Sequence, residues 1–316
     1  MYEKSCFVLL TNQCNLRCTH CYNVLDPNKS SITEEENSLS IQKLSDLFTE
    51  LIKNGFTKVL FSGGEALLRK DIFTILKEAK KKGLNTALFT NGHMLSEDVV
   101  DKLGEAGLKE IRISFNELVW INNRKQYEKI FSNQTKYLSM LKNADISVGY
   151  VYIVSGYNID YTYETYLNLQ KLGASMKIQP LYIPKNFEKY DEVSASAIPL
   201  EKWEKLKSLF SNDNLNNTEI KEYPSSVYGA NEEIINYIDF LIDVYCKKNI
   251  PNSCPTGPIL VVDSSGAFHP CLFRYDVICG NISNKQDIIN VNDILKNYKN
   301  LEKAECYREE CLSAFR

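Results

Sequence analysis

Six short runs of apolar residues, rich in β-branched and aromatic side chains, recur between polar stretches in the first part of the chain. They cover residues 7–11, 59–61, 86–89, 111–114, 148–154 and 178–183. Each run is typical of a buried parallel strand. The stretches between them carry helical spacing, as in Leu44, Leu47, Phe48 and Leu51. Six β/α units predict either an open doubly wound sheet or a barrel, and their number fits a partial (β/α)6 TIM-like barrel.

The alternation stops after residue 183, and the next stretch is polar. It contains one predicted helix, with Trp203, Leu206, Leu209 and Phe210 at helical spacing. A strongly amphipathic helix follows, with Ile234, Ile235, Ile238, Leu241 and Ile242 apolar. We therefore expect an α/β barrel domain over residues 1–190, bridging helices over 191–250, and a small cysteine-rich domain of a β-hairpin plus a helix over 251–316.

Charge and composition narrow the class of protein. The 316 residues carry a formal net charge of −3, which argues against a nucleic-acid binder. The apolar stretch at the N-terminus is too short for a signal peptide or a membrane span, so we expect a cytoplasmic protein without a membrane partner. In that reducing compartment, the ten cysteines are expected to bind metal or to act in catalysis.

The first cysteine group follows the first predicted strand directly. Cys14, Cys18 and Cys21 stand in CNLRCTHC, where a barrel places its active-site loops. Because a 4Fe-4S cluster is normally closed by four thiolates, three thiolates would leave one iron open to another ligand. A zinc site is the alternative, although zinc sites usually use four ligands.

Further polar residues follow the ends of later strands. Gly63, Gly64 and Glu65 follow the second strand, where glycines permit close approach of a ligand and Glu65 supplies an acceptor for an ammonium group. Asn91 ends the third strand, and Ser114 the fourth; Asn158 lies near the end of the fifth. Because parallel strands end at one edge, these residues are candidates for a single site.

These motifs resemble the radical S-adenosylmethionine (SAM) superfamily. The resemblance implies that Cys14, Cys18 and Cys21 hold a 4Fe-4S cluster whose open iron binds SAM. It further implies that Gly63, Gly64, Glu65, Asn91, Ser114 and Asn158 contact SAM, and that His20 packs near its adenine. Asn116 departs from the aspartate common in the family. In such enzymes the reduced cluster cleaves SAM to a 5′-deoxyadenosyl radical, which abstracts a hydrogen atom from the substrate.

The second cysteine group lies in the C-terminal region. Cys254 and Cys271 flank a predicted hairpin with a turn at 264–266, and Cys306 and Cys311 follow in CYREEC. Four thiolates could close a cluster or hold a structural zinc. The region resembles the SPASM/Twitch auxiliary domain, which implies one auxiliary 4Fe-4S cluster. Cys6, Cys246 and Cys279 are most simply small buried hydrophobic residues.

The resemblance favours a ribosomally synthesised peptide or a protein side chain as substrate, with a reductant such as flavodoxin or ferredoxin. Oxidation or epimerisation of a small molecule, such as an amino sugar or a tetrapyrrole, is the alternative, and a non-catalytic iron-sulfur or zinc protein is another. Little sequence precedes Cys14 for recognition of a leader peptide. We do not expect molybdopterin-type cyclisation, because the chain ends in LSAFR instead of a glycine pair.

Overall fold

The computed structural model describes residues 4–18, 20–21, 39–181, 190–212, 231–247, 249, 259–272, 277–284, 287 and 290–292. The chain divides into two compact units. The first comprises Met1–Ile113, Tyr137–Val148 and Thr256–Cys306, and the second comprises Ser114–Lys136, Gly149–Pro255 and Tyr307–Arg316. Within the described parts of the chain, no helix has the length and apolar character that a membrane crossing requires.

Parallel strands form the centre of the first unit. They are β1 (Ser5–Leu9), β2 (Lys58–Ser62), β3 (Asn85–Thr90) and β4 (Glu110–Ser114), which pair in the order of the sequence. On the other side of β1 lies β7 (Leu260–Val262), also parallel, with Cys6 opposite Leu260. The antiparallel strands β8 (Ala267–His269) and β9 (Gly280–Asn281) follow. The C-terminal hairpin therefore extends the same sheet.

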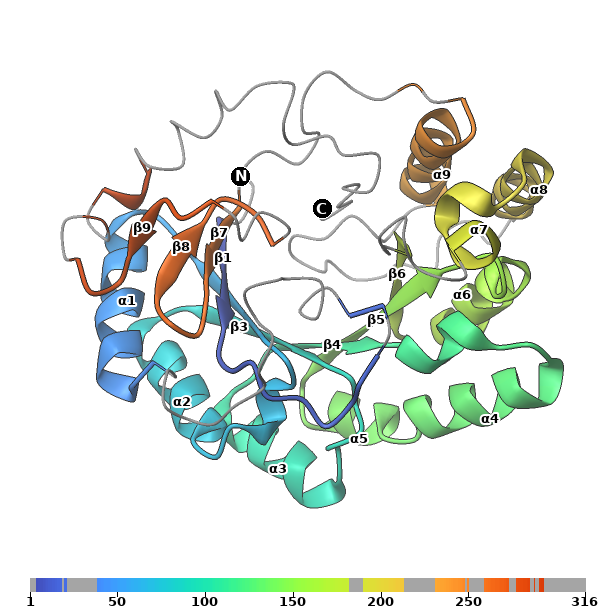
Figure 1. Ribbon diagram of the computed structural model, residues 1–316. Helices are drawn as coiled ribbons and strands as arrows, with labels where there is room; N and C mark the ends of the chain where they lie inside the picture. Colours follow the sequence, from blue (N-terminus) through green and yellow to red (C-terminus); the bar gives the residue numbers. More distant parts are fainter. Residues whose placement is uncertain are drawn as a thin grey trace. The chain divides into compact units, whose positions relative to one another are not determined.

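Helices cover one face of this sheet. They are α1 (Ile41–Lys53), α2 (Ile72–Lys82) and α3 (Glu97–Ala106), which lie side by side in Figure 1, followed by α5 (Leu138–Asn143). The predicted apolar stripe of α1, from Leu44 to Leu51, is buried, and Phe48 meets Phe61 of β2 edge to face with a centroid distance of 6.0 Å. Burial of this stripe attaches the helix to the strands.

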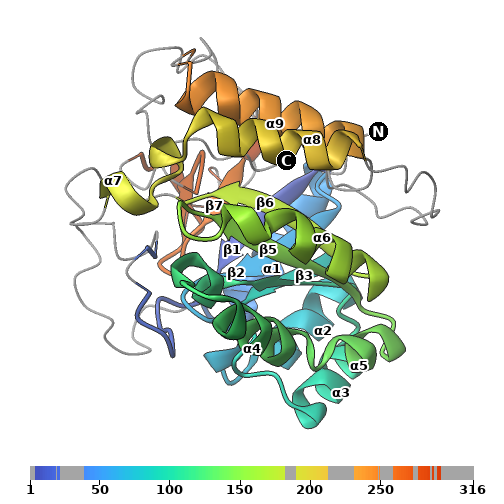
Figure 2. The same cartoon turned by 90° about the vertical axis from the view of Figure 1, so that its right-hand side faces the viewer.

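The second unit contains the parallel pair β5 (Ser147–Val154) and β6 (Ser175–Pro180). Its helical elements are η3 (Asn116–Trp120), α4 (Arg124–Thr135), η4 (Ile159–Tyr161), α6 (Thr162–Lys171), α7 (Tyr190–Val193), η5 (Ala195–Ala197), α8 (Leu200–Ser211) and α9 (Asn231–Tyr245). Helices α8 and α9 lie side by side, as Figure 2 shows. Trp203, Leu206 and Phe210 form the buried face of α8.

The predicted elements agree with these strands and helices. All six parallel strands are present, although β6 begins three residues before the predicted run, and residues 182–183 lie outside the described part. In the described residues the parallel strands do not close on themselves, which is consistent with a partial TIM-like barrel. The hairpin with its turn before β8 is confirmed. Leu209 is 38% exposed and does not belong to the buried face of α8.

Candidate functional site

Backbone hydrogen bonds join the loop after β1 to the end of β2. The N–H of Leu10 donates to Ser62 O (2.9 Å), the N–H of Gly64 donates to Thr11 O (2.8 Å), and the N–H of Glu65 donates to Gln13 O (2.7 Å). The last of these contacts lies one residue before Cys14. The end of β2 therefore holds the chain that leads into the first cysteine motif.

Gly63 and Gly64 make this approach possible. A Cβ atom on Gly63 would lie 2.4 Å from Thr11 O, and one on Gly64 would lie 2.2 Å from Gln13 O. Gly63 also has a φ of +142°, which disfavours any residue with a side chain. The close approach that the structure shows at these glycines is to the backbone of the cysteine loop, whereas the sequence predicted an approach to a ligand.

The Glu65 carboxylate is almost fully buried, at 1% exposed. Its Oε1 accepts hydrogen bonds from Thr90 Oγ1 (2.9 Å) and from the N–H of Leu67 (3.0 Å), and its Oε2 accepts one from the N–H of Asn91 (2.8 Å). Burial raises the pKa of Glu65, although these hydrogen bonds oppose the rise. Since each carboxylate oxygen has two lone pairs, Oε2 can still accept one more donor.

Asn91 connects Glu65 with the cysteine loop. Its amide nitrogen donates to Asn15 Oδ1 (2.8 Å) and lies 3.9 Å from Cys14 Sγ, while its Oδ1 accepts from the N–H of His93 (2.9 Å). The structure thus brings Cys14, Glu65 and Asn91, which are widely separated in the sequence, into one hydrogen-bonded group.

Cys14, Cys18 and Cys21 are all partly exposed. Burial raises the pKa of the Cys14 thiol; the N–H of Leu16 opposes that rise, and the charges of Glu65 and Cys21 add to it. Among the described residues, no three His, Cys, Asp or Glu side chains converge closely enough to hold a metal ion. That criterion describes a single ion, whereas a 4Fe-4S cluster spaces its thiolates farther apart, and three thiolates are the donors that a cluster with one open iron takes.

The remaining predicted SAM contacts differ in their surroundings. His20 is buried, and Ser114 ends β4 with partial exposure. The Asn158 side chain is fully buried: its Oδ1 accepts from the N–H of Ser155 (2.8 Å), and its amide donates to Leu118 O (3.1 Å) and Ile153 O (2.7 Å). Both amide hydrogens are therefore used within the protein, so in this structure Asn158 holds the end of β5 against η3.

The second cysteine group lies mostly outside the described residues. This applies to Cys254, Cys306 and Cys311, whereas Cys271 follows β8 and is partly exposed. Cys6 is confirmed as a buried residue. Cys246 and Cys279 are only partly buried. Burial raises the pKa of Cys279 to about 11, and its Sγ donates to Phe268 O (3.1 Å).

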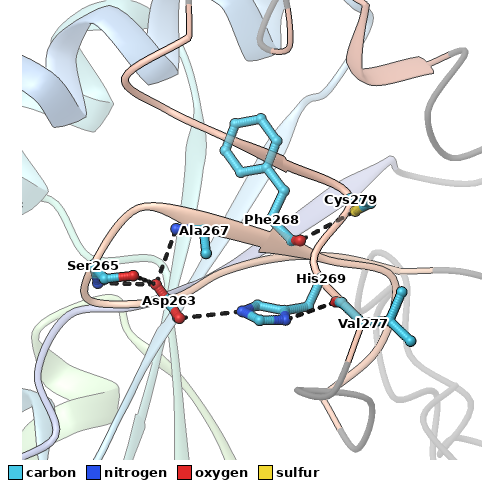
Figure 3. Close-up of polar contacts among 7 residues, drawn as sticks. All are labelled: Asp263, Ser265, Ala267, Phe268, His269, Val277 and Cys279. Atoms are coloured by element: carbon cyan, nitrogen blue, oxygen red, sulfur yellow. Dashed lines mark hydrogen bonds and ion pairs between the residues drawn. The ribbon is translucent and has the colours of Figure 1, made fainter.

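A polar network holds the hairpin that leads to Cys271. Figure 3 shows His269 between Asp263 Oδ2 (3.1 Å from Nε2) and Val277 O (2.9 Å from Nδ1). Asp263 Oδ1 accepts from the N–H (2.9 Å) and Oγ (2.6 Å) of Ser265 and from the N–H of Ala267 (3.0 Å). Although burial opposes ionisation, these hydrogen bonds lower the pKa of Asp263 to about 2. The ionised carboxylate therefore stabilises the turn.

Thr90 and Asn15, which bond to Glu65 and Asn91, and Arg69 were not among the predicted site residues. Arg69 follows η2 (Ala66–Leu68), and its guanidinium is hydrogen-bonded to Leu10 O, Leu39 O and Asp71. No sequence pattern distinguishes Arg69, a basic residue shortly after a glycine-rich motif, from an ordinary surface arginine. Only the fold shows that its side chain points back to the loop after β1.

Two curated proteins are similar to this chain. The Fe-coproporphyrin III synthase of Methanosarcina barkeri is 30% identical over 151 residues, which make up 48% of this chain and 37% of that protein. The probable GTP 3′,8-cyclase of Methanocaldococcus jannaschii is 27% identical over 323 residues, with 98% of this chain and 94% of that protein covered. The chain thus spans little more than a third of the first relative and nearly all of the second.

Solved structures show the same fold. One is anSMEcpe with bound AdoMet, with a TM-score of 0.61 and 18% identity over 94% of this chain and 82% of that chain. Another is SuiB of Streptococcus suis bound to S-adenosylmethionine, with a TM-score of 0.63 and 13% identity over 95% of this chain and 68% of that chain.

The sequence profile of the Radical SAM superfamily matches residues 8–169, slightly more than half of the chain. The match includes the three cysteines of the loop after β1, the Gly63–Glu65 motif and Asn91, and among these the structure joins Cys14, Glu65 and Asn91 by hydrogen bonds. The chain belongs to the Radical SAM superfamily and is an enzyme of that class.

Proposed function

We propose that Cys14, Cys18 and Cys21 hold a 4Fe-4S cluster at which SAM binds, and that the enzyme modifies a ribosomally synthesised peptide or a protein side chain. The observation that supports this site best is the connection of the two motifs. Asn91 bonds to Glu65 through its backbone and lies beside Cys14 through its side chain. A ligand bound at the cysteines would therefore lie close to an oriented carboxylate.

The chain's own residues would bind and orient the cofactors. When bound, the cluster and SAM supply the radical chemistry that removes a hydrogen atom from the substrate. The spare acceptor position on Glu65 Oε2 suits the ammonium group of SAM, since an ammonium is a donor and the site is buried. Gly63, Gly64, Asn91, Ser114 and His20 complete the proposed contacts, and Asn158 supports the end of β5 from within the fold.

The peptide substrate is supported by a protein of the same fold. SuiB of Streptococcus suis has been solved with the precursor peptide SuiA, and that structure matches 95% of this chain with a TM-score of 0.60. At 13% identity the likeness concerns the fold, so the substrate class is our inference.

Cyclisation of a nucleotide is the second candidate. It is favoured by the match to a probable GTP 3′,8-cyclase, which extends over 98% of this chain. This match weighs against the expectation, drawn from the C-terminal residues, that such chemistry is absent. Other small-molecule reactions, such as modification of a tetrapyrrole, have support from a relative that matches about half of the chain.

For the second cysteine group we propose one auxiliary 4Fe-4S cluster held by Cys254, Cys271, Cys306 and Cys311. Four thiolates would leave no open iron, so this cluster would transfer electrons or stabilise the fold. A flavodoxin or ferredoxin would deliver the electrons from outside.

The test is anaerobic reconstitution followed by reduction in the presence of SAM. About eight irons per chain are expected for two clusters. The wild type should form 5′-deoxyadenosine, and Cys18→Ala should not. A fully loaded wild type that never cleaves SAM would contradict the proposal.

The substrate class is tested with the same assay. GTP, with ATP as the control nucleotide, should leave 5′-deoxyadenosine formation unchanged if the enzyme acts on peptides, while a precursor peptide should stimulate it and gain a mass change. Stimulation by GTP and not by ATP would replace the peptide proposal with cyclisation.

A further inference from the structure

Arg69 contacts the chain at two points that flank the three cysteines in the sequence. Its Nη1 donates to Leu10 O (3.0 Å), four residues before Cys14, and its Nη2 donates to Leu39 O, just before the N-cap of α1. The arginine side chain is only 8% exposed. Both carbonyls are therefore held by a single buried guanidinium.

Asp71 orients this guanidinium. Its Oδ1 accepts from Nε of Arg69 (2.7 Å) and its Oδ2 accepts from Nη2 (3.1 Å), a bidentate pair. The guanidinium is planar and rigid, so fixing one edge against Asp71 directs the remaining donors. A lysine ammonium, being a point charge, could not reproduce this arrangement.

The two ends that Arg69 contacts are also held by other groups. At the first end, the N–H of Leu10 donates to Ser62 O, so both backbone groups of this residue are bonded. At the second end, the Leu39 side chain is buried and would lie 3.1 Å from a Cβ on Gly266, in the turn of the hairpin that leads to Cys271. Arg69 thus acts where the cysteine loop, α1 and the hairpin come together.

We propose that Arg69 is a positioning residue, whose guanidinium joins Leu10 to Leu39 and thereby holds the intervening cysteines ready to bind the cluster. This rests on the proposed function, because it assigns the cluster to Cys14, Cys18 and Cys21. The function of Arg69 is geometric: it depends on two carbonyls reached from one planar group, and not on its positive charge alone.

The test compares Arg69→Gln, Arg69→Lys and Asp71→Asn in the full chain, with Arg124→Gln as the matched control. Arg124 is an exposed arginine on α4, paired with Glu128 and Glu164. Two measurements are made on each variant. The first is hydrogen exchange of the Gly64 and Glu65 amides in the cluster-free protein, and the second is the rate of iron loss to a chelator after reconstitution.

In Arg69→Gln we expect exchange at both amides and iron loss to rise about tenfold or more, because a charge-assisted bond to each carbonyl is lost. Arg69→Lys should not restore the wild-type rates of exchange and iron loss. In Asp71→Asn both rates should lie between those of the wild type and those of Arg69→Gln. If Arg69→Gln does not fold, Arg69→Lys and Asp71→Asn are compared with the wild type by the same two rates. The control should match the wild type.

Three results would overturn the proposal. One is a folded Arg69→Gln with wild-type exchange and iron retention, and another is full rescue by Arg69→Lys, which would show that charge alone is required. The third is an Arg124→Gln variant in which amide exchange and iron loss rise as much as in Arg69→Gln. If the wild type bound no cluster at the three cysteines, the proposed function would fail, and the exchange rates of the cluster-free chain would still report on Arg69.

Discussion

Gly64→Ala should displace the cysteine loop from the end of β2. The new Cβ would lie 2.2 Å from Gln13 O and 2.8 Å from Asn12 O, where 3.4 Å is an ordinary contact. The loop would have to move by about 1 Å, which takes the Glu65 N to Gln13 O distance of 2.7 Å beyond hydrogen-bond range. Gly64 does not have a positive φ, so the cost comes from the contact and not from backbone strain.

The expected cost follows from two parts. The loss of the hydrogen bonds to Thr11 O and Gln13 O contributes about 1 to 3 kcal/mol. Overpacking against backbone that cannot rotate away adds about 1 to 3 kcal/mol. We therefore expect Gly64→Ala to lower the free energy of unfolding by about 2 to 6 kcal/mol.

The measurement is urea unfolding of the cluster-free chain, followed by iron determination after reconstitution. Gly83→Ala is the matched control, because Gly83 has a φ of +92° and a Cβ added there would have nothing within 4 Å. In that control, backbone strain should lower the free energy of unfolding by about 1 to 2 kcal/mol, and the iron content should match the wild type. Equal stability and equal iron content in the two variants would refute the reasoning.

Three further changes test the surrounding contacts. Asn158→Ala should lower the free energy of unfolding by about 2 to 4 kcal/mol without SAM, since three buried hydrogen bonds are lost; unchanged stability would point to a ligand contact. The pKa of Asp263 is about 2 in the folded chain, below its ordinary 3.8. The ionised carboxylate therefore contributes about 2 kcal/mol to the free energy of unfolding above pH 3.8, and this contribution is lost as the pH falls from 3.8 through about 2. Thermal unfolding of Asp263→Asn should lack this acid dependence, and an unchanged pH profile would count against it. Gly266→Ala places a Cβ 2.2 Å from Ile282 at a φ of +91°, and should lower the melting temperature by more than Gly83→Ala does.

The strands could be predicted because their residues are buried on both faces. Apart from Gly149, the run 148–154 consists of β-branched and aromatic residues, and it lies in β5. The start of β6 was missed because Ser175 and Lys177 alternate with buried Met176 and Ile178, so only the later part of the strand was apolar enough to recognise. The pairing of β7 with β1 joins residues more than 250 positions apart in the sequence, and no local pattern indicates it.

The candidate site was predictable where the spacing itself reports chemistry. Few kinds of site place three cysteines directly after a strand or a glycine pair directly before a glutamate, so these two motifs could be identified from the sequence. The partners of these residues are not local. The orientation of Asn158 toward backbone carbonyls, and of Arg69 toward Leu10, depends on tertiary packing that amphipathic patterns do not encode.

The glycine pair illustrates how one motif can satisfy two requirements. Its lack of side chains lets the cysteine loop approach, and the hydrogen bond from the N–H of Glu65 to Gln13 O then places that carboxylate beside the loop. The carboxylate in turn bonds to Asn91, whose amide lies 3.9 Å from Cys14 Sγ. A loop that was held less closely would separate the thiols from the acceptor. The same contacts that stabilise the cluster-free fold would therefore determine how far a ligand on the proposed cluster lies from Glu65, which is why changes at Gly64 should affect stability and iron retention together.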